Sequence, residues 1–439
     1  MSEIKATYRE IIAIALPLMI GNMAWAFIGL TDQAFMGHYG RVEEAAIGPV
    51  SIFYSILFMI GFGYSRGIQI LMAKAYGAND NKRVGFLFDN SAFVMIVVSV
   101  IVMIALFVYK DFLLRILLSD EQIILAANEF LEYRIIGIPA SFLSTVFVSF
   151  YSGIGKTRLL SVSVLTMAII NIILNYLLVF GEYGFPKMGI GGAGIASSIA
   201  EWISLCILSS GLILKGYLKK FDILKLNINF SEIISMSKTS TPLVMQSILG
   251  NLGWFVFFTL VEKLGQKELA SSNILRQLMM WIGIPIWALG SVTNTVVGNL
   301  IGQKAEHQIK NAIEKILKVS LSITVIQSSI LLLFYSFIIS IFSADTTMAI
   351  FSYRATWVII TATFIMSISN TLFNALVTSC GTRFALYFEL FALAAYMLYI
   401  YFLFSFDSLS VAQAWTTEWI YWSVILVASF FKLKQQKII

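Results

Sequence analysis

Charge, cysteine and histidine are all scarce in this sequence. Only 12% of the 439 residues are charged, whereas a soluble globular chain carries about 25%. A soluble chain of this length would need more charged side chains to cover its domain surfaces. Cys206 and Cys380 lie in apolar stretches, and the two histidines are His38 and His307. We therefore expect no disulfide framework, no zinc site and no enzyme.

Apolar residues are abundant instead, at 59% of the chain. A helix needs about 20 mostly apolar residues to cross the hydrocarbon core of a bilayer. No stretch alternates apolar and polar residues with the period of two that is typical of a β-barrel. The sequence predicts an all-α polytopic membrane protein with twelve transmembrane helices, at residues 11–35, 47–73, 85–109, 130–152, 159–181, 190–214, 234–261, 270–300, 313–342, 355–378, 384–406 and 410–431.

The net charge of +6 is explained by membrane orientation rather than by nucleic-acid binding. With a cytoplasmic N-terminus, 20 of the 30 Lys and Arg residues fall on the cytoplasmic side and nine, Arg134 among them, on the outer side. Cytoplasmic loops of membrane proteins are enriched in Lys and Arg. We predict a multi-pass protein of the inner (plasma) membrane with both termini in the cytoplasm.

The chain contains an internal repeat at an offset of 225 residues. Matched pairs include Pro17 and Pro242, Gly40 and Gly265, Asp120 and Asp345, and Arg158 and Arg383. Six spans per repeat make the two halves enter the membrane in the same direction, which is a parallel repeat. We predict two six-helix bundles, an N-terminal lobe at 1–215 and a C-terminal lobe at 234–439, joined by a cytoplasmic linker at 216–233. Two lobes that rock against each other favour a transporter over a passive scaffold.

Few polar side chains lie at membrane depth. Asp32 belongs to the first span, where an Asp costs about 2.5–3.5 kcal/mol at the centre of the helix. Function and an interfacial position near the helix end explain it equally well. Asn171 and Asn175 lie one turn apart and share a helix face. Their amides can offer oxygen to a hard cation, or they can bridge two helices.

Other polar and aromatic residues are weaker candidates. Glu201 follows Ser197 by one turn, and it either acts in coupling or only faces polar neighbours. Arg66 lies about 10–16 Å from the cytoplasmic end of its span, which predicts a wet cavity or a partner. Glu389 is predicted to be interfacial. The possible substrate-cleft residues, for which helix packing is the competing explanation, are Trp25, Gln246, Asn251, Trp254, Asn370 and Asn374.

The sequence gives no support to nucleotide binding. Gly189, Gly191 and Gly194 form the pattern G-x-G-x-x-G, but they open an apolar span and no strand precedes them. Close helix packing explains these glycines better than a dinucleotide does. A P-loop motif is missing, so the sequence does not encode ATP as an energy source.

Several segments resemble the multidrug and toxic compound extrusion (MATE) transporters. These segments are TDQAFMGHYG (31–40), YSGIGKTR (151–158), NIILNYLLVFGEYGFPKMGIGGAGIA (171–196) and LVTSCGTR (376–383). The resemblance implies a V-shaped cleft and an antiporter that exports small drug-like compounds in exchange for Na⁺ or H⁺, with no other cofactor. It implies that Asp32 is the cation-linked acid and that Na⁺ at Asp32 is the one metal to expect, with Asn171 and Asn175 beside it. Some members have Asp in place of Asn175 and an acid in the seventh helix, and this chain has neither.

Two other functions remain open. A flippase for lipid-linked oligosaccharides, from the wider superfamily, predicts a cleft richer in Lys and Arg than Arg66 alone supplies. A membrane protein without transport activity is less favoured. In each case we expect a monomer in the lipid bilayer. The sequence specifies neither the substrate nor the choice between Na⁺ and H⁺.

Overall fold

The computed structural model describes residues 4–342, 345, 347–405 and 409–439. Within these ranges the regular structure is helical throughout. Eleven of the described helices are long and apolar enough to cross a membrane. The last predicted span, at 410–431, overlaps the shorter helix α16 (Thr417–Gln435), which corresponds in the repeat to α7 (Gly189–Leu214). The predicted all-α, twelve-helix fold is confirmed.

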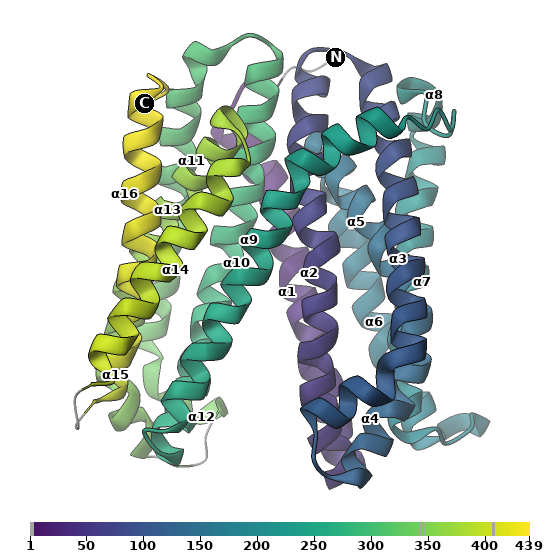
Figure 1. Ribbon diagram of the computed structural model, residues 1–439, viewed down its shortest axis with the longest axis vertical. Coiled ribbons are helices and arrows are strands. Elements are labelled where there is room, and N and C mark those ends of the chain that lie inside the picture. Colours follow the sequence, from purple (N-terminus) through teal and green to yellow (C-terminus); the bar gives the residue numbers. More distant parts are fainter. Residues whose placement is uncertain (1–3, 343–344, 346, 406–408) are drawn as a thin grey trace. The chain divides into compact units, whose positions relative to one another are not determined.

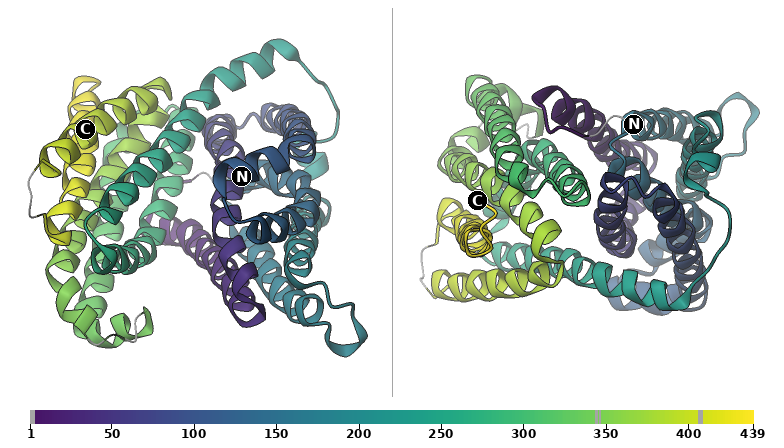
Figure 2. Two further views of the ribbon diagram at one scale, coloured as in Figure 1. Left: turned by 60° about the horizontal axis from the view of Figure 1, so that its bottom comes forward. Right: turned by 90° about the horizontal axis from the view of Figure 1, so that it is seen from above.

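The helices of the first repeat run side by side within their own bundle (Figures 1 and 2). They are α1 (Tyr8–Tyr39), α2 (Arg41–Gly77), α3 (Asn81–Leu117), α4 (Glu121–Arg134), the 3-10 turn η1 (Ile135–Gly137), α5 (Ile138–Gly153), α6 (Arg158–Phe180) and α7. The predicted span at 130–152 is thus the continuous α4–η1–α5 unit. After α7, the short α8 (Tyr217–Phe221) begins the linker.

The second repeat follows the same order. Its helices are α9 (Phe230–Glu262), α10 (Gln266–Gly302), α11 (Ile309–Leu333), α12 (Tyr335–Phe342), α13 (Thr347–Cys380), α14 (Arg383–Leu403), α15 (Val411–Trp415) and α16. The bounds of α10 are those of α2 shifted by the predicted 225 residues, and α14 begins at the same offset from α6. The parallel repeat is therefore visible in the helix boundaries.

Helix caps explain one of the matched pairs in the repeat. The Asp120 side chain caps α4 by accepting hydrogen bonds from the backbone N–H groups of Gln122 (2.8 Å) and Ile123 (3.3 Å). Its repeat mate Asp345 accepts from the backbone N–H of Thr347 at 2.8 Å, where α13 begins. Each carboxylate satisfies backbone donors that the first turn leaves unpaired.

Several helices, α2 among them, are longer than the apolar stretches predict. The second span is predicted at 47–73, whereas α2 covers Arg41–Gly77. Glu43 and Glu44 lie in its first turn and Lys74 in its last. Acidic residues favour the N-terminal end of a helix and basic residues its C-terminal end, so charged segments that end an apolar run continue the helix.

The chain divides into two compact units. One comprises Leu16–Lys238, here called the N-terminal unit. The other, the C-terminal unit, comprises Thr239–Ile439 together with the chain up to Ala15. A buried apolar cluster of the N-terminal unit includes Met36, Ile47, Phe130, Val179 and Ile190, contributed by five helices.

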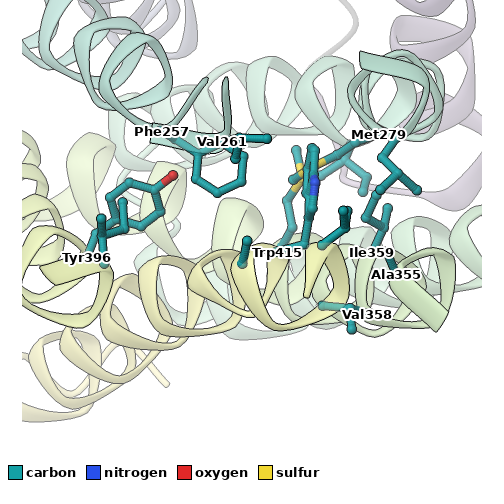
Figure 3. Packing of buried hydrophobic residues seen from close by; sticks show 14 residues of the cluster. Phe257, Val261, Met279, Ala355, Val358, Ile359, Tyr396 and Trp415 are labelled. Atoms are coloured by element: carbon teal, nitrogen blue, oxygen red, sulfur yellow. The ribbon is translucent and has the colours of Figure 1, made fainter. Parts of the chain in front are cut away.

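The C-terminal unit has a larger apolar cluster around Trp415 (Figure 3). The Trp415 side chain is 1% exposed, and its indole N–H donates to the Ser272 hydroxyl at 3.1 Å. The rings of Phe257 and Trp254 meet it edge-on, with centroids 5.3 and 6.2 Å away. Trp254, a predicted cleft residue, is thus part of this packing.

Candidate functional site

Asp32 lies in the N-terminal unit, two turns before α1 ends at Tyr39. The side-chain amide of Asn175 on α6 donates to Asp32 Oδ1 at 2.6 Å. The hydroxyl of Ser197 on α7 donates to Asp32 Oδ2 at 3.2 Å. Asp32 itself is partly exposed, whereas Asn175 and Ser197 are buried. Three helices therefore bring polar groups to one carboxylate that keeps an open side.

Asn171 completes this cluster. Its side-chain amide donates to the Ser197 hydroxyl at 3.0 Å, and its carbonyl oxygen accepts from Asn175 Nδ2 at 3.2 Å. Asn171 and Asn175 are fully buried. The carbonyl oxygen of Asn175 has no hydrogen-bond partner among the described residues. A buried acceptor without a donor costs about 1–3 kcal/mol, so the cluster favours a bound positive group at this oxygen.

Glycines allow α7 to approach its neighbours closely enough to place Ser197. A Cβ atom on Gly192 would lie 2.7 Å from the carbonyl oxygen of Leu178 on α6. A Cβ atom on Gly194 would lie 2.5 Å from the carbonyl oxygen of Phe130 on α4. These contacts leave no room for a side chain, which confirms that the glycine-rich pattern serves helix packing.

The donor set of the cluster fits a small hard cation or a proton. Asp32, Ser197 and the two asparagines offer oxygen atoms, which hard cations prefer over nitrogen and sulfur. Among the described residues, no three His, Cys, Asp or Glu side chains gather as they do around a transition metal. The single carboxylate limits the negative charge, which suits a monovalent ion better than a divalent one.

Glu201 forms a second polar layer one turn further along α7. Its carboxylate pairs with the Arg134 guanidinium through two hydrogen bonds of 2.8 and 2.5 Å. The guanidinium also lies over the Tyr54 ring, 4.0 Å from its centroid, and the Tyr54 hydroxyl donates to Glu201 at 3.4 Å. Both charged side chains are nearly buried, at 11% and 13% exposed. Glu201 is thus paired with a cation of its own.

The other predicted residues of the N-terminal unit lie apart from Asp32. Arg66 is partly exposed on α2, about 18 Å along the helix axis from Tyr54. Trp25 is 48% exposed on α1 and stacks on Phe58, with ring centroids 5.8 Å apart. Trp25 therefore presents an aromatic face.

In the C-terminal unit, two predicted asparagines lie between packed helices. The amide of Asn370 donates to the carbonyl oxygen of Ile286 on α10 at 2.7 Å, and the Asn374 amide donates to the Asn370 carbonyl at 2.8 Å. A Cβ atom on Gly290 would lie 2.6 and 2.7 Å from their amide nitrogens. These contacts join α10 to α13. Asn251 is exposed and donates to the carbonyl of Ser247.

Gln246 contacts the carboxylate of Glu389, whose burial the sequence does not predict. Glu389 is predicted to be interfacial, but its side chain is fully buried. It accepts hydrogen bonds from the Gln246 amide (3.0 Å) and from the Tyr421 hydroxyl (2.8 and 3.0 Å). This burial arises because α9 and α16 cover this part of α14, and distance along a single helix does not predict it.

Arg134 and Tyr54 are the site residues that the sequence does not reveal. Arg134 ends α4, within the predicted span at 130–152, and the charge count places it on the outer side of the membrane. The structure adds that η1 continues into α5, so Arg134 lies inside a continuous helical unit. The sequence does contain one signal for this pair. Arg134 stands between apolar residues inside one predicted span, and Glu201 lies inside another.

Sequence comparison relates the chain to membrane transporters. The MatE family model matches it twice, at residues 17–177 and 242–402, which are separated by the same 225 residues as the repeat. A probable multidrug resistance protein NorM from Thermotoga maritima is 26% identical over 377 residues, covering 85% of this chain and 80% of the relative. A probable NorM from Photorhabdus laumondii is 23% identical, covering 77% and 74%.

Structure comparison shows the same fold. An outward-facing multidrug resistance MATE family transporter of the MOP superfamily superposes with a TM-score of 0.89 at 16% identity, covering 98% of this chain and 96% of that one. A mutant of the Vibrio cholerae MATE transporter VcmN gives 0.87 at 14% identity, covering 98% and 96%. The two-lobed, twelve-helix architecture is therefore shared.

Proposed function

Because this chain belongs to the MatE family, a family of multi-pass membrane transporters, we propose that it is a secondary antiporter that exports small organic compounds. The coupling ion is Na⁺ or H⁺, and it binds at Asp32. The observation that carries the proposal is the Asp32 cluster, in which three helices surround one carboxylate at membrane depth. The names of the NorM relatives support multidrug export.

The cluster gives the ion a way to act on the helices. Asp32, Asn175 and Ser197 belong to three different helices, so an ion bound among them pulls these helices together. Loss of the ion leaves a charged carboxylate facing two neutral donors. An ion can drive a conformational change only if it binds one state more tightly than the other. The cluster meets this requirement when Asp32, Asn175 and Ser197 are assembled in one state and separated in the other, so that only one state binds the ion tightly.

Flux measurements in proteoliposomes test the proposal. Purified protein is reconstituted, and ethidium movement is followed under an Na⁺ gradient alone and under a pH gradient alone. We expect one of the two gradients to drive accumulation. We expect Asp32→Asn to abolish it and Asp111→Asn, the same change at an exposed position of the same unit, to leave it intact.

The same assay separates the alternatives. Gradient-driven flux that persists in the Asp32→Asn variant would contradict the site. Failure of a panel of organic cations, anions and neutral compounds under both gradients would contradict export of small organic compounds. Movement of a lipid-linked oligosaccharide in the same vesicles would favour a flippase instead.

We propose, from the distribution of Lys and Arg residues between the two sides of the membrane, that both termini lie in the cytoplasm. Single cysteines are introduced at Lys225 in the linker and at Tyr183, which is 84% exposed between α6 and α7, after Cys206 and Cys380 are replaced by Ala. A membrane-impermeant maleimide added to whole cells should label position 183 and not position 225. The opposite labelling pattern would reverse the orientation.

A further inference from the structure

We infer that the Arg134–Glu201 pair sets the charge of the Asp32 site, so that this site accepts one positive charge from the coupling ion. The inference rests on the proposed function, because it concerns the ion bound at Asp32. The pair is a two-bond ion pair with both side chains nearly buried. A buried charge needs a partner, and the bidentate geometry supplies one for each of these two.

The position of the pair links it to Asp32. Ser197, which donates to Asp32, and Glu201, which accepts from Arg134, lie one turn apart on the same face of α7. Arg134 and Asp32 also attract each other electrostatically. The hydrogen bonds of the Arg134 guanidinium go to Glu201.

Tyr54 holds Arg134 on Glu201 rather than on Asp32. Its ring lies under the guanidinium at 4.0 Å, and its hydroxyl donates to the same Glu201 oxygen that accepts from Arg134 Nη1. A cation over an aromatic face is stabilised by the ring quadrupole, which fixes the plane of the guanidinium. The pair is thus built to stay closed while the ion enters and leaves.

The charges of the three residues decide how much positive charge the site can take. Asp32 and Glu201 contribute one negative charge each and Arg134 one positive charge, so the group carries a net charge of −1. One Na⁺ or one proton neutralises it, whereas a divalent cation leaves an excess positive charge in a poorly hydrated place. If Glu201 is neutral, Arg134 balances Asp32, and an incoming cation meets a site with no net charge.

Gly137 provides a way to open the pair without removing either charge. A Cβ atom at Gly137 would collide with the Glu201 carboxylate and would lie 2.7 Å from Arg134 Nη1. Both atoms are the ends of flexible side chains, so they can move aside. The φ angle of −78° at Gly137 suits alanine, so Gly137→Ala should displace the pair without straining the backbone.

The test uses purified full-length protein and two ions as probes. The melting temperature is titrated with NaCl against choline chloride, and separately with acid. We expect the wild type to be stabilised by one of the two ions. Glu201→Gln should raise the ion concentration needed for half of this effect by about tenfold or more. The Arg134→Met/Glu201→Gln double variant should return to within about threefold of the wild type, since its net charge is again −1.

Two further variants separate charge from packing. Glu121→Gln breaks the Arg115–Glu121 pair, which has the same two-bond geometry but is exposed, and it should leave the ion response unchanged. Gly137→Ala should weaken the response while the protein stays monodisperse.

The outcomes distinguish this inference from the proposed function. If neither ion stabilises the wild type, the proposed ion site fails and the inference fails with it. If Asp32→Asn abolishes the response while Glu201→Gln responds like the wild type, only the inference fails. It also fails if the double variant is as impaired as Glu201→Gln, because a role in packing alone predicts no recovery.

Discussion

At corresponding positions of the repeat, the N-terminal unit has polar and charged side chains where the C-terminal unit has mostly apolar ones. At the repeat offset of 225, Asp32 corresponds to Phe257, and the two asparagines correspond to Tyr396 and Ile400. The counterparts of Tyr54 and Arg134 are Met279 and Ile359, and that of Ser197 is Trp422. All six counterparts belong to or pack against the apolar cluster around Trp415 (Figure 3).

This difference separates fold from function. The bundle tolerates either a polar cluster or an apolar core at this position, so the fold does not require the charges. A polar cluster at membrane depth costs stability, and such residues are usually retained for function. The C-terminal unit keeps its own buried acids elsewhere, with Glu389 bonded to Tyr421 and Glu418 bonded to Trp422.

The largest expected effect on stability comes from placing an acid in the apolar cluster of the C-terminal unit. In the Phe257→Asp variant a carboxylate enters an apolar cluster in which Phe257 is 2% exposed. We expect a loss of about 3 kcal/mol or more in the free energy of unfolding. Thermal unfolding in detergent measures it, with Phe257→Leu as the control. Equal stability of the two variants would show that both units accept an acid at this position.

The second effect tests the close packing that α7 needs. The backbone carbonyl of Phe130 blocks a Cβ atom at Gly194, and backbone cannot move as easily as a side-chain end. Gly194→Ala should cost about 1–3 kcal/mol of stability. The repeat counterpart of Gly194 is Trp419, whose indole N–H donates hydrogen bonds to Val358 and Thr361. The C-terminal unit therefore fills the same place with a large side chain. A melting temperature unchanged by Gly194→Ala would contradict the packing argument.

A third effect concerns ion binding rather than stability. Asn175→Leu removes the donor to Asp32 and the unpaired oxygen, at a cost of about 1–3 kcal/mol in ion affinity. Because the counterpart Ile400 is apolar and buried, we expect the fold to persist. The ion-dependent shift in melting temperature measures the loss, with Leu178→Val on the same helix as a control. A full ion response in Asn175→Leu would remove this residue from the site.

The smallest effect comes from a single hydroxyl. Ser197→Ala deletes the 3.2 Å hydrogen bond to Asp32 and should weaken ion binding by about 1 kcal/mol. Ser198→Ala, at the next residue, removes a hydroxyl that donates to the Tyr133 carbonyl and should leave ion binding unchanged. Titration of the melting temperature with the ion compares the two variants. An equal loss of ion affinity in both would contradict the assignment of Ser197.

Much of this arrangement can be predicted from the sequence. Apolar stretches of membrane length and the offset of 225 indicate the twelve helices and their two repeats. Asp32, Asn171 and Asn175 attract attention because polar groups are rare in such helices, and the structure brings them together with Ser197.

The sequence is less informative about how the helices rotate and pack. The burial of Glu389 is not predicted, because burial depends on which neighbours cover a helix face and a single helix does not show this. Arg134 escapes prediction because a charge at the end of an apolar stretch looks the same in a loop and in a buried ion pair. Both cases concern contacts between residues more than 30 positions apart.

Direct measurement of ion binding by the wild type and by Asp32→Asn tests the central claim. Purified protein in detergent is titrated with NaCl by calorimetry, and its proton uptake on acidification is recorded in weak buffer. We predict that the wild type and Asp111→Asn bind one ion per chain at this site and that Asp32→Asn does not bind it. Equal ion binding by Asp32→Asn and the wild type would contradict it.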